Sequence, residues 1–317
     1  MMVILLLAGA YVGWNIGAND TANCIGTTVG AGLLPFSRAV LIVALFAILG
    51  ALLQGQHVMK TIGKGIVHQE LDYLAVCVAL VSSGLFVTLA TFKRIPTSTS
   101  QAIVGGVVGI GLAVNAPINT AKFWTIAGSW IICPLMVMIL AYTLSRLIGA
   151  ILARVQASIL IVQQVMGWLA ILSGCYVAYS MGANNAGNAV GSISSLGLFP
   201  PMGLLALGGG AIAAGAITYG RKVADTVGKG ITTLDVRGAF VAQTASAAGM
   251  HLFSIWGIPV STSSAIVGAV VGVGLVKGAR SISRKTLVTI LLGWVLTPCL
   301  AAVTSFAVYL LLAAVFG

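Results

Sequence analysis

The sequence predicts an all-α membrane protein made of two inverted-topology repeats of about five transmembrane segments each, with broken or re-entrant helices at the centre. Composition predicts the membrane setting: 59% of the 317 residues are hydrophobic, 7% are charged, and the mean hydropathy is +1.10. A soluble domain typically carries about a quarter charged residues. Two pairs of matched polar motifs, one member in each half of the chain, predict the duplication.

Four landmarks of the first half of the chain recur in the second half in an almost constant register. They are Gly17–Asn23 with Gly182–Asn188, Gly63–Ile66 with Gly228–Ile231, Ile95–Ser100 with Ile258–Ser263, and Trp130 and Pro134 with Trp294 and Pro298. A fixed register over several landmarks indicates structural repeats. We place the first repeat at residues 1–155 and the second at 156–317.

Ten apolar stretches could cross a bilayer, which takes about 20 residues in a helix. They cover residues 2–18, 37–58, 71–92, 97–115, 123–150, 160–182, 202–218, 236–257, 260–276 and 285–316. Five crossings per repeat is an odd number, so the two repeats should have opposite orientations. Treating a neighbouring pair of stretches as a re-entrant hairpin leaves this parity unchanged.

The basic residues predict the orientation in the membrane. If the ten stretches alternate, thirteen of the 16 Lys and Arg residues fall on one side, and only Lys60, Lys64 and Lys122 fall on the other. Cytoplasmic loops carry the excess of Lys and Arg. We therefore expect a multi-pass protein of the plasma (cytoplasmic) membrane with both termini outside.

The first polar motif suggests a cation site. Asp20 is the only acid expected within the membrane, where charged residues are costly and usually functional. Gly and Asn tolerate non-helical backbone, so we expect helix breaks here, followed by short helices near 21–33 and 186–195. Carboxylate, amide and backbone oxygens suit Na⁺, although Asp20 could instead carry a proton, or the motif could simply join helices by hydrogen bonds. The predicted cation-binding residues are Asp20, Asn23, Asn188, Asn19, Asn184 and Asn185.

The second motif suggests an anion site. Pro followed by Ser and Thr and then a Gly-rich apolar run marks a helix start, in Pro96–Gln101 and again in Pro259–Ser264. Free N–H groups at a helix start attract anions, and hydroxyls add donors. One such start alone would more often be ordinary N-capping, but two matched starts favour an oxyanion held from both sides. The predicted ligands are Thr97, Ser98, Thr99, Ser100, Ser261, Thr262, Ser263 and Ser264.

Several functional classes are not supported by the sequence. The five cysteines and three histidines are scattered and form no metal-ligand or disulfide spacing. No catalytic triad spacing or phosphate-binding loop is present, so we expect no enzyme and no cofactor. The net charge of +11 is accounted for by cytoplasmic loops, and nucleic-acid binding is not expected.

The motifs resemble those of the inorganic phosphate transporter (PiT) family. Gly17–Thr27 is similar to the family signature, and its second copy and the two Ile-Pro-x-Ser-Thr-Ser segments also match. The resemblance implies symport of inorganic phosphate with Na⁺ or H⁺, cation coupling at Asp20, and phosphate contact at the Ser/Thr segments. This chain departs from the family pattern at two positions. Many family members carry an acid where this chain has Asn185, and some relatives carry one where this chain has Gln243. The long hydrophilic central loop of animal relatives is also absent.

These observations together predict a secondary transporter that imports inorganic phosphate by symport with Na⁺, or else with H⁺. Sulfate or another oxyanion is an alternative substrate, because a few relatives move sulfate. An anion channel without ion coupling and a structural or signalling membrane subunit are alternatives from other classes. The expected partners are phosphate or sulfate, the coupling cation and the lipid bilayer, and a homo-oligomer is compatible with the sequence.

Overall fold

Helices make up the fold. The computed structural model describes residues 1–69, 71–92, 97–155, 158–227, 234–278 and 284–316, and within them the only strand-like pairing is a bridge between Val67 and Ile118. The elements are α1 (Met2–Gly30), α2 (Phe36–Gln54), α3 (Gln56–Lys60), the π-helix η1 (Thr61–Gly65), α4 (Tyr73–Phe92), α5 (Thr99–Ala113), α6 (Thr120–Arg154), α7 (Ile159–Ser194), α8 (Pro201–Val227), α9 (Val236–Ile255), α10 (Thr262–Lys277) and α11 (Arg284–Phe316). The predicted all-α fold class is confirmed.

The helices are those of an integral, multi-pass membrane protein. Among the described residues, seven helices are long and apolar enough to cross a bilayer: α1, α2, α4, α6, α7, α8 and α11. Large apolar side chains on α6, such as Ile131 and Ile139, are at least 60% exposed, as suits contact with lipid and not with water. The apolar helices α5 and α10 are shorter. Nine of the ten predicted stretches overlap one helix each, and the stretch 37–58 overlaps both α2 and α3.

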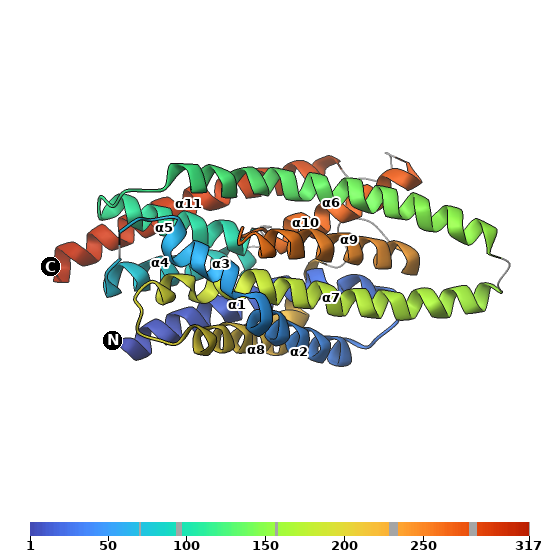
Figure 1. Ribbon diagram of the computed structural model, residues 1–317, viewed down its shortest axis with the longest axis horizontal. Coiled ribbons are helices and arrows are strands. Elements are labelled where there is room, and N and C mark those ends of the chain that lie inside the picture. Colours follow the sequence, from blue (N-terminus) through green and yellow to red (C-terminus); the bar gives the residue numbers. More distant parts are fainter. Residues whose placement is uncertain (70, 93–96, 156–157, 228–233, 279–283, 317) are drawn as a thin grey trace.

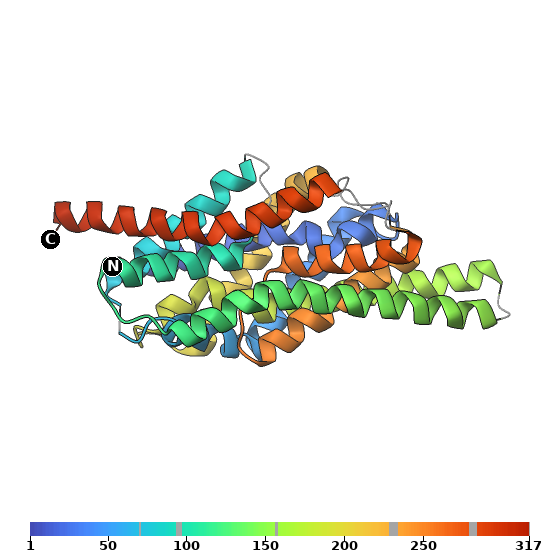
Figure 2. The same cartoon turned by 90° about the horizontal axis from the view of Figure 1, so that it is seen from above.

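The two halves of the chain run in opposite directions along the long axis of the molecule. Both termini lie at the same end of this axis, and the end of α6 and the start of α7 lie at the other end (Figures 1 and 2). As a result α1 leads away from the N-terminal end, whereas α7 leads back towards it. The predicted boundary between residues 155 and 156 falls between the end of α6 and the start of α7.

Helix packing near the first motif is matched between the halves. A Cβ added at Gly17 on α1 would overlap the carbonyl oxygen of Ile212 on α8, and one at Gly182 on α7 would overlap that of Ala47 on α2. The register that pairs Gly17 with Gly182 also pairs Ala47 with Ile212. Small residues allow such close backbone approach inside membranes. These glycines therefore hold α1 on α8 and α7 on α2 in the same way.

The short helices α5 and α10 are packed in an equally matched manner. Gly105 on α5 lies against the Pro298 backbone of α11, and Gly268 on α10 lies against the Pro134 backbone of α6. Both prolines are inside their long helices, where a proline removes one backbone hydrogen bond. The short helix of each half therefore packs against a long helix of the other half.

The predicted helix breaks at the asparagine motifs are wrong. Residues 17–23 lie inside the uninterrupted α1 and residues 182–188 lie inside the uninterrupted α7. The predicted short helices near 21–33 and 186–195 are therefore parts of longer helices. The glycines serve close helix contacts, and the Asn side chains find side-chain partners, so neither residue type needs to open the backbone. In a membrane, a broken helix would leave backbone groups that require other partners.

The Gly-Lys-Gly landmark can be followed in one half only. Gly63, Lys64 and Gly65 lie in the π-helix η1, next to α3. Their predicted counterparts, Gly228–Ile231, lie outside the described residues.

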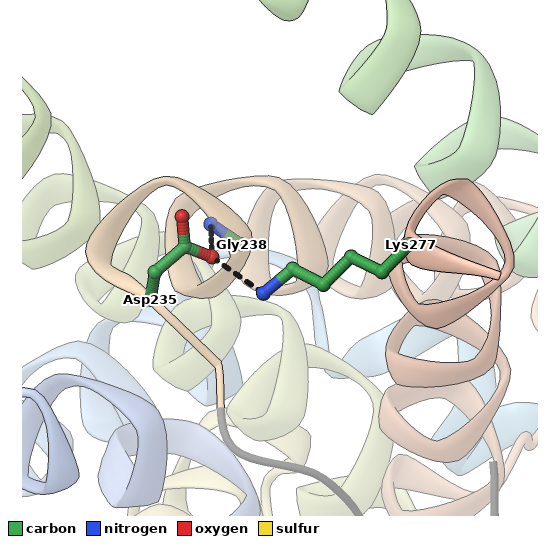
Figure 3. A network of polar contacts seen from close by, with 3 residues as sticks. All are labelled: Asp235, Gly238 and Lys277. Carbon is green, nitrogen blue, oxygen red and sulfur yellow. Dashed lines mark hydrogen bonds and ion pairs between the residues drawn. The ribbon is translucent and has the colours of Figure 1, made fainter. Parts of the chain in front are cut away.

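Two helical hairpins, α4–α5 and α9–α10, reach the centre of the molecule. Each first helix begins with an aspartate cap: Asp72 accepts from the Ala75 N–H at 2.7 Å, and Asp235 accepts from the Gly238 N–H at 3.3 Å. Asp235 also pairs with Lys277 at the end of α10, at 3.1 Å (Figure 3). Burial alone would raise the pKa of Asp235, but its hydrogen bond to Lys277 and the charges of Lys277 and Arg237 lower it.

Candidate ion and anion binding site

The two Ser/Thr-rich helix starts meet in the interior, as the sequence predicts. Ser98 caps α5 by accepting from the Gln101 N–H at 3.3 Å, and Ser261 caps α10 by accepting from the Ser264 N–H at 3.2 Å. Ser100 on α5 donates its single hydroxyl proton either to the Val260 carbonyl oxygen just before α10, at 2.8 Å, or to Asn185, at 3.0 Å. The starts of α5 and α10 are therefore in direct contact.

Asn185 lies at the centre of this junction, and its amide is fully used. Its oxygen faces the Ser100 hydroxyl and accepts from the Asn188 Nδ2 at 2.9 Å. Its nitrogen donates to the Thr262 hydroxyl at 2.8 Å and to the Asp20 Oδ2 at 3.4 Å. One neutral side chain of α7 thus connects both Ser/Thr helix starts to the acid of α1.

Asp20 is buried, with 1% of its surface exposed, and it is surrounded by neutral donors. Asn19 and Asn23 donate to its Oδ1 at 3.2 and 3.4 Å, and the Thr262 hydroxyl is also bonded to it. Within the described residues the one ion pair is Asp235–Lys277, so no basic side chain there compensates Asp20. An uncompensated buried charge is costly, and this position therefore favours a bound cation or a proton.

Two hydrogen bonds are matched between the halves. Asn188 on α7 donates to Ser100 at the start of α5 at 2.9 Å, and Asn23 on α1 donates to Ser263 at the start of α10 at 3.0 Å. Each asparagine motif therefore contacts the Ser/Thr start of the opposite half. The site is shared by both halves and belongs to neither one alone.

Asn184 is placed differently from the other predicted cation ligands. Its nitrogen donates to Ser254 at 3.0 Å and to the Ile258 carbonyl oxygen at 3.2 Å, and its oxygen accepts from the Val260 N–H at 3.1 Å. These three bonds tie the side chain to the end of α9 and to the segment between α9 and α10, so Asn184 fixes the hairpin tip. Asn19, in contrast, does reach Asp20.

Some buried polar atoms around the helix starts have no hydrogen-bond partner. These are the hydroxyls of Thr97 and Ser264, the whole amide of Gln101, and the Asn188 Oδ1. Unpaired buried polar groups are uncommon and require an explanation such as a ligand or water. Gln101 was not among the predicted ligands, although it ends the first Ser/Thr run. The sequence did indicate Gln101 in one way, because it lies in the first turn of α5 and the register between the halves pairs it with the predicted ligand Ser264.

Fold and site together define an integral all-α membrane protein with a buried polar site assembled from both halves of the chain. The sequence model of the Phosphate transporter family matches residues 16–305. The chain belongs to this family.

Known relatives extend the match over nearly the whole chain. A Chlamydia muridarum protein named "Putative phosphate permease" is 28% identical over 100% of this chain and 99% of its own length. The chloroplastic inorganic phosphate transporter 2-1 of Arabidopsis thaliana is 27% identical over 92% of this chain and 69% of its own length. A solved structure described as the sodium-dependent phosphate transporter has a TM-score of 0.88 and 29% identity, and 99% of each chain is covered.

Proposed function

We propose that this protein imports inorganic phosphate by symport with Na⁺, and that the coupling cation binds at Asp20. The observation that carries the proposal is the placement of one uncompensated carboxylate beside two Ser/Thr-rich helix starts that touch each other. The carboxylate provides a cation site, and the helix starts provide donors for an oxyanion.

The proximity of the two sites gives coupling a physical basis. A phosphate dianion is costly to bring into a region of low dielectric constant. A cation beside Asp20 reduces that cost, because Thr262 contacts both Asp20 and Asn185 within the anion site. Two opposite unit charges about 4 Å apart attract by about 4 kcal/mol at an effective dielectric constant of 20. Binding of either ligand therefore favours binding of the other.

Na⁺ is favoured over H⁺ by the ligand set. The Asn188 Oδ1 is buried without a donor and lies on the side chain that bonds to Asn185, next to Asp20. Hard cations are bound by carboxylate and carbonyl oxygens, whereas a proton needs only the carboxylate. The related solved structure is described as sodium-dependent, which also supports Na⁺.

Anion contact is assigned to Thr97, Ser98, Thr99 and Ser100 and to Ser261, Thr262, Ser263 and Ser264. The unpartnered hydroxyls of Thr97 and Ser264 support this assignment, because each can donate to an oxyanion. Gln101 joins this set, since its buried amide offers both donors and an acceptor. Asn23 and Asn188 are assigned to the cation with Asp20, while Asn184 and Asn185 orient the surrounding groups.

Alternating access would follow from two inverted repeats, residues 1–155 and 156–317, exchanging conformations around this shared site. The matched glycine contacts and the opposite directions of the two halves support the proposal (Figure 1). Single cysteines in place of Lys64 and Lys229 should be labelled from opposite sides of the membrane. Labelling of both from one side would rule out the inversion. The excess of basic residues supports a plasma membrane location with both termini outside.

Uptake by purified protein in proteoliposomes tests the function. Labelled phosphate should accumulate when an inward Na⁺ gradient is imposed and should not accumulate with a choline gradient. A pH gradient alone should have little effect, and accumulation driven by it would assign the coupling to H⁺. Stronger competition by sulfate than by unlabelled phosphate would favour a sulfate permease. Equilibration without any dependence on a cation gradient would indicate an anion channel.

A further inference from the structure

A second buried polar cluster includes none of the proposed ligand residues and lies where α9 contacts α1 and α7. Gln243 on α9 is completely buried. Its Nε2 donates to the Cys24 carbonyl oxygen and to the Thr28 hydroxyl of α1, both at 2.9 Å. Its Oε1 accepts from the Ser173 hydroxyl of α7 at 2.8 Å. One amide therefore joins three helices.

The same place in the first half of the chain is apolar. The register that pairs Asp72 with Asp235, and Ser98 with Ser261, pairs Leu80 with Gln243. The register that pairs Gly17 with Gly182 pairs Ala8 with Ser173 and Thr28 with Ile193. Leu80, Ala8 and Ile193 are all buried. Apolar side chains are therefore sufficient to pack the equivalent junction of the first half. The polar cluster in the second half needs an explanation other than packing.

The place where Gln243 contacts α1 supplies that explanation. Cys24 directly follows Asn23, and Asn23 contacts both Asp20 and Ser263. The α9–α10 hairpin is consequently attached to α1 at two levels, by Ser263 near its tip and by Gln243 further along α9. A hairpin held at two levels cannot tilt relative to α1 without breaking hydrogen bonds, and inside a membrane the freed groups have no water to replace them.

We propose that Gln243 is a positioning residue that couples the cation site on α1 to the phosphate-binding start of α10. By fixing α9 to the turn of α1 next to Asn23, it makes the position of Ser261–Ser264 depend on the state of the cation site. Coupling of this kind appears as a factor by which one ligand changes the affinity for the other, typically about 5- to 150-fold. This inference rests on the proposed phosphate and Na⁺ symport.

The test is the Na⁺ dependence of the phosphate KM, measured in proteoliposomes at low and at saturating Na⁺. Gln243→Leu places at this position the residue that the first half carries at Leu80. We expect the factor by which Na⁺ lowers the phosphate KM to shrink by about 10-fold, while uptake at saturating phosphate and Na⁺ stays within about 3-fold of the original. A purely structural role would reduce maximal uptake or protein yield and leave that factor intact.

Ser246→Ala is the matched control, because Ser246 is a buried residue of the same helix whose hydroxyl has no partner. In Ser246→Ala, Na⁺ should lower the phosphate KM by the same factor as in the unaltered protein. If Gln243→Leu does not fold, the variants Ser173→Ala and Thr28→Val test the proposal instead, since each removes one hydrogen-bond partner of Gln243. They should each reduce the factor by about 3-fold, as expected for a bond of modest strength.

An unchanged factor in folded Gln243→Leu, or in both milder variants, would overturn the proposal. So would a loss of maximal uptake with an intact factor. Failure of the proposed function itself is distinct, because the unaltered protein would then show no Na⁺-dependent phosphate uptake at all.

Discussion

Asp20 and Asn185 occupy equivalent positions in the two halves, yet their surroundings give them different roles. Asp20 accepts hydrogen bonds, and in the described part of the chain no basic side chain compensates its charge. Asn185 uses both its donors and its acceptor, and one donor is directed at Asp20 itself. The backbone packing around the two residues is matched, but the charge is found on one side only. The packing is therefore alike around the two residues, whereas the difference between Asp20 and Asn185 makes the site asymmetric in charge.

The largest effect should come from removing the single charge. Asp20→Asn should reduce Na⁺-coupled phosphate uptake by about three orders of magnitude, because about 4 kcal/mol of attraction to a cation is lost at an effective dielectric constant of 20. Proteoliposome uptake under a Na⁺ gradient measures it, and membrane insertion and a monodisperse gel-filtration profile serve as the control. Full coupled uptake by this variant would remove Asp20 from the cation site.

Giving the second half its own charge should alter the cation dependence. Asn185→Asp places two carboxylates in contact, where the Asn185 Nδ2 now lies 3.4 Å from the Asp20 Oδ2. Like charges at this separation repel by about 5 kcal/mol at an effective dielectric constant of 20, and an additional cation would relieve the repulsion. The Hill coefficient for Na⁺ should therefore increase. An unchanged coefficient with normal uptake would mean that the two positions do not share one site.

Alanine pairs compare the two helix starts. Thr262 and Ser263 contact Asp20, Asn185 and Asn23, whereas Ser98 caps its own helix. Replacing Thr262 and Ser263 with alanine should raise the phosphate KM by about 10-fold or more, since hydrogen bonds to charged groups contribute roughly 1.5–3 kcal/mol. The Ser98 and Thr99 double variant should raise it less. Equal KM values in both variants and in the unaltered protein would place the anion elsewhere.

A smaller contrast concerns two equivalent tyrosine contacts. The Tyr11 hydroxyl lies 2.6 Å from the Thr88 hydroxyl, and at the matching positions of the second half the Tyr176 hydroxyl lies 2.8 Å from the His251 Nδ1. A neutral histidine can accept from Tyr176, and a protonated one cannot. Mild acidification should lower the unfolding temperature of the unaltered protein by a few degrees more than that of His251→Thr, about the effect of one hydrogen bond. Parallel pH profiles would contradict the contact.

The smallest effect, one on stability, should come from the aspartate caps at the starts of α4 and α9. Asp72→Asn and Asp235→Asn both keep a good helix cap, but only Asp235 pairs with Lys277 (Figure 3). Asp235→Asn should therefore cost up to about 1 kcal/mol more than Asp72→Asn. Because the pKa of Asp235 is lowered, this contribution is complete near neutral pH and is lost only as the pH falls through that lowered pKa. Equal unfolding temperatures for the two variants would show that the ion pair adds nothing.

Much of the architecture could be predicted because it follows from local patterns. Apolar stretches located the helices, and the Ser98 and Ser261 caps were visible in the sequence as helix starts. The meeting of these starts was also predictable, since matched motifs in a duplicated membrane protein indicate a shared site. Family resemblance added the expected substrate class to these physical arguments.

The rest depends on partners that the sequence does not reveal. Gly17 and Gly182 were interpreted as helix breakers, because glycine favours that role locally, whereas the contacts with Ile212 and Ala47 use it for close packing. Asn184 was predicted from its motif alone to bind a cation, and no local pattern indicated that its amide bonds to Ser254 on α9 and to the backbone of Ile258 and Val260. The partners of Gln243 on α1 and α7 lie far away in sequence, so no local pattern could indicate them.

Phosphate binding to the purified protein, titrated calorimetrically in Na⁺ and in choline at equal ionic strength, tests the central claim most directly. The account predicts that Na⁺ strengthens phosphate binding in the unaltered protein and has no effect on phosphate binding in Asp20→Asn. Equal phosphate affinity in the two salts for the unaltered protein, or an undiminished Na⁺ effect in Asp20→Asn, would contradict it.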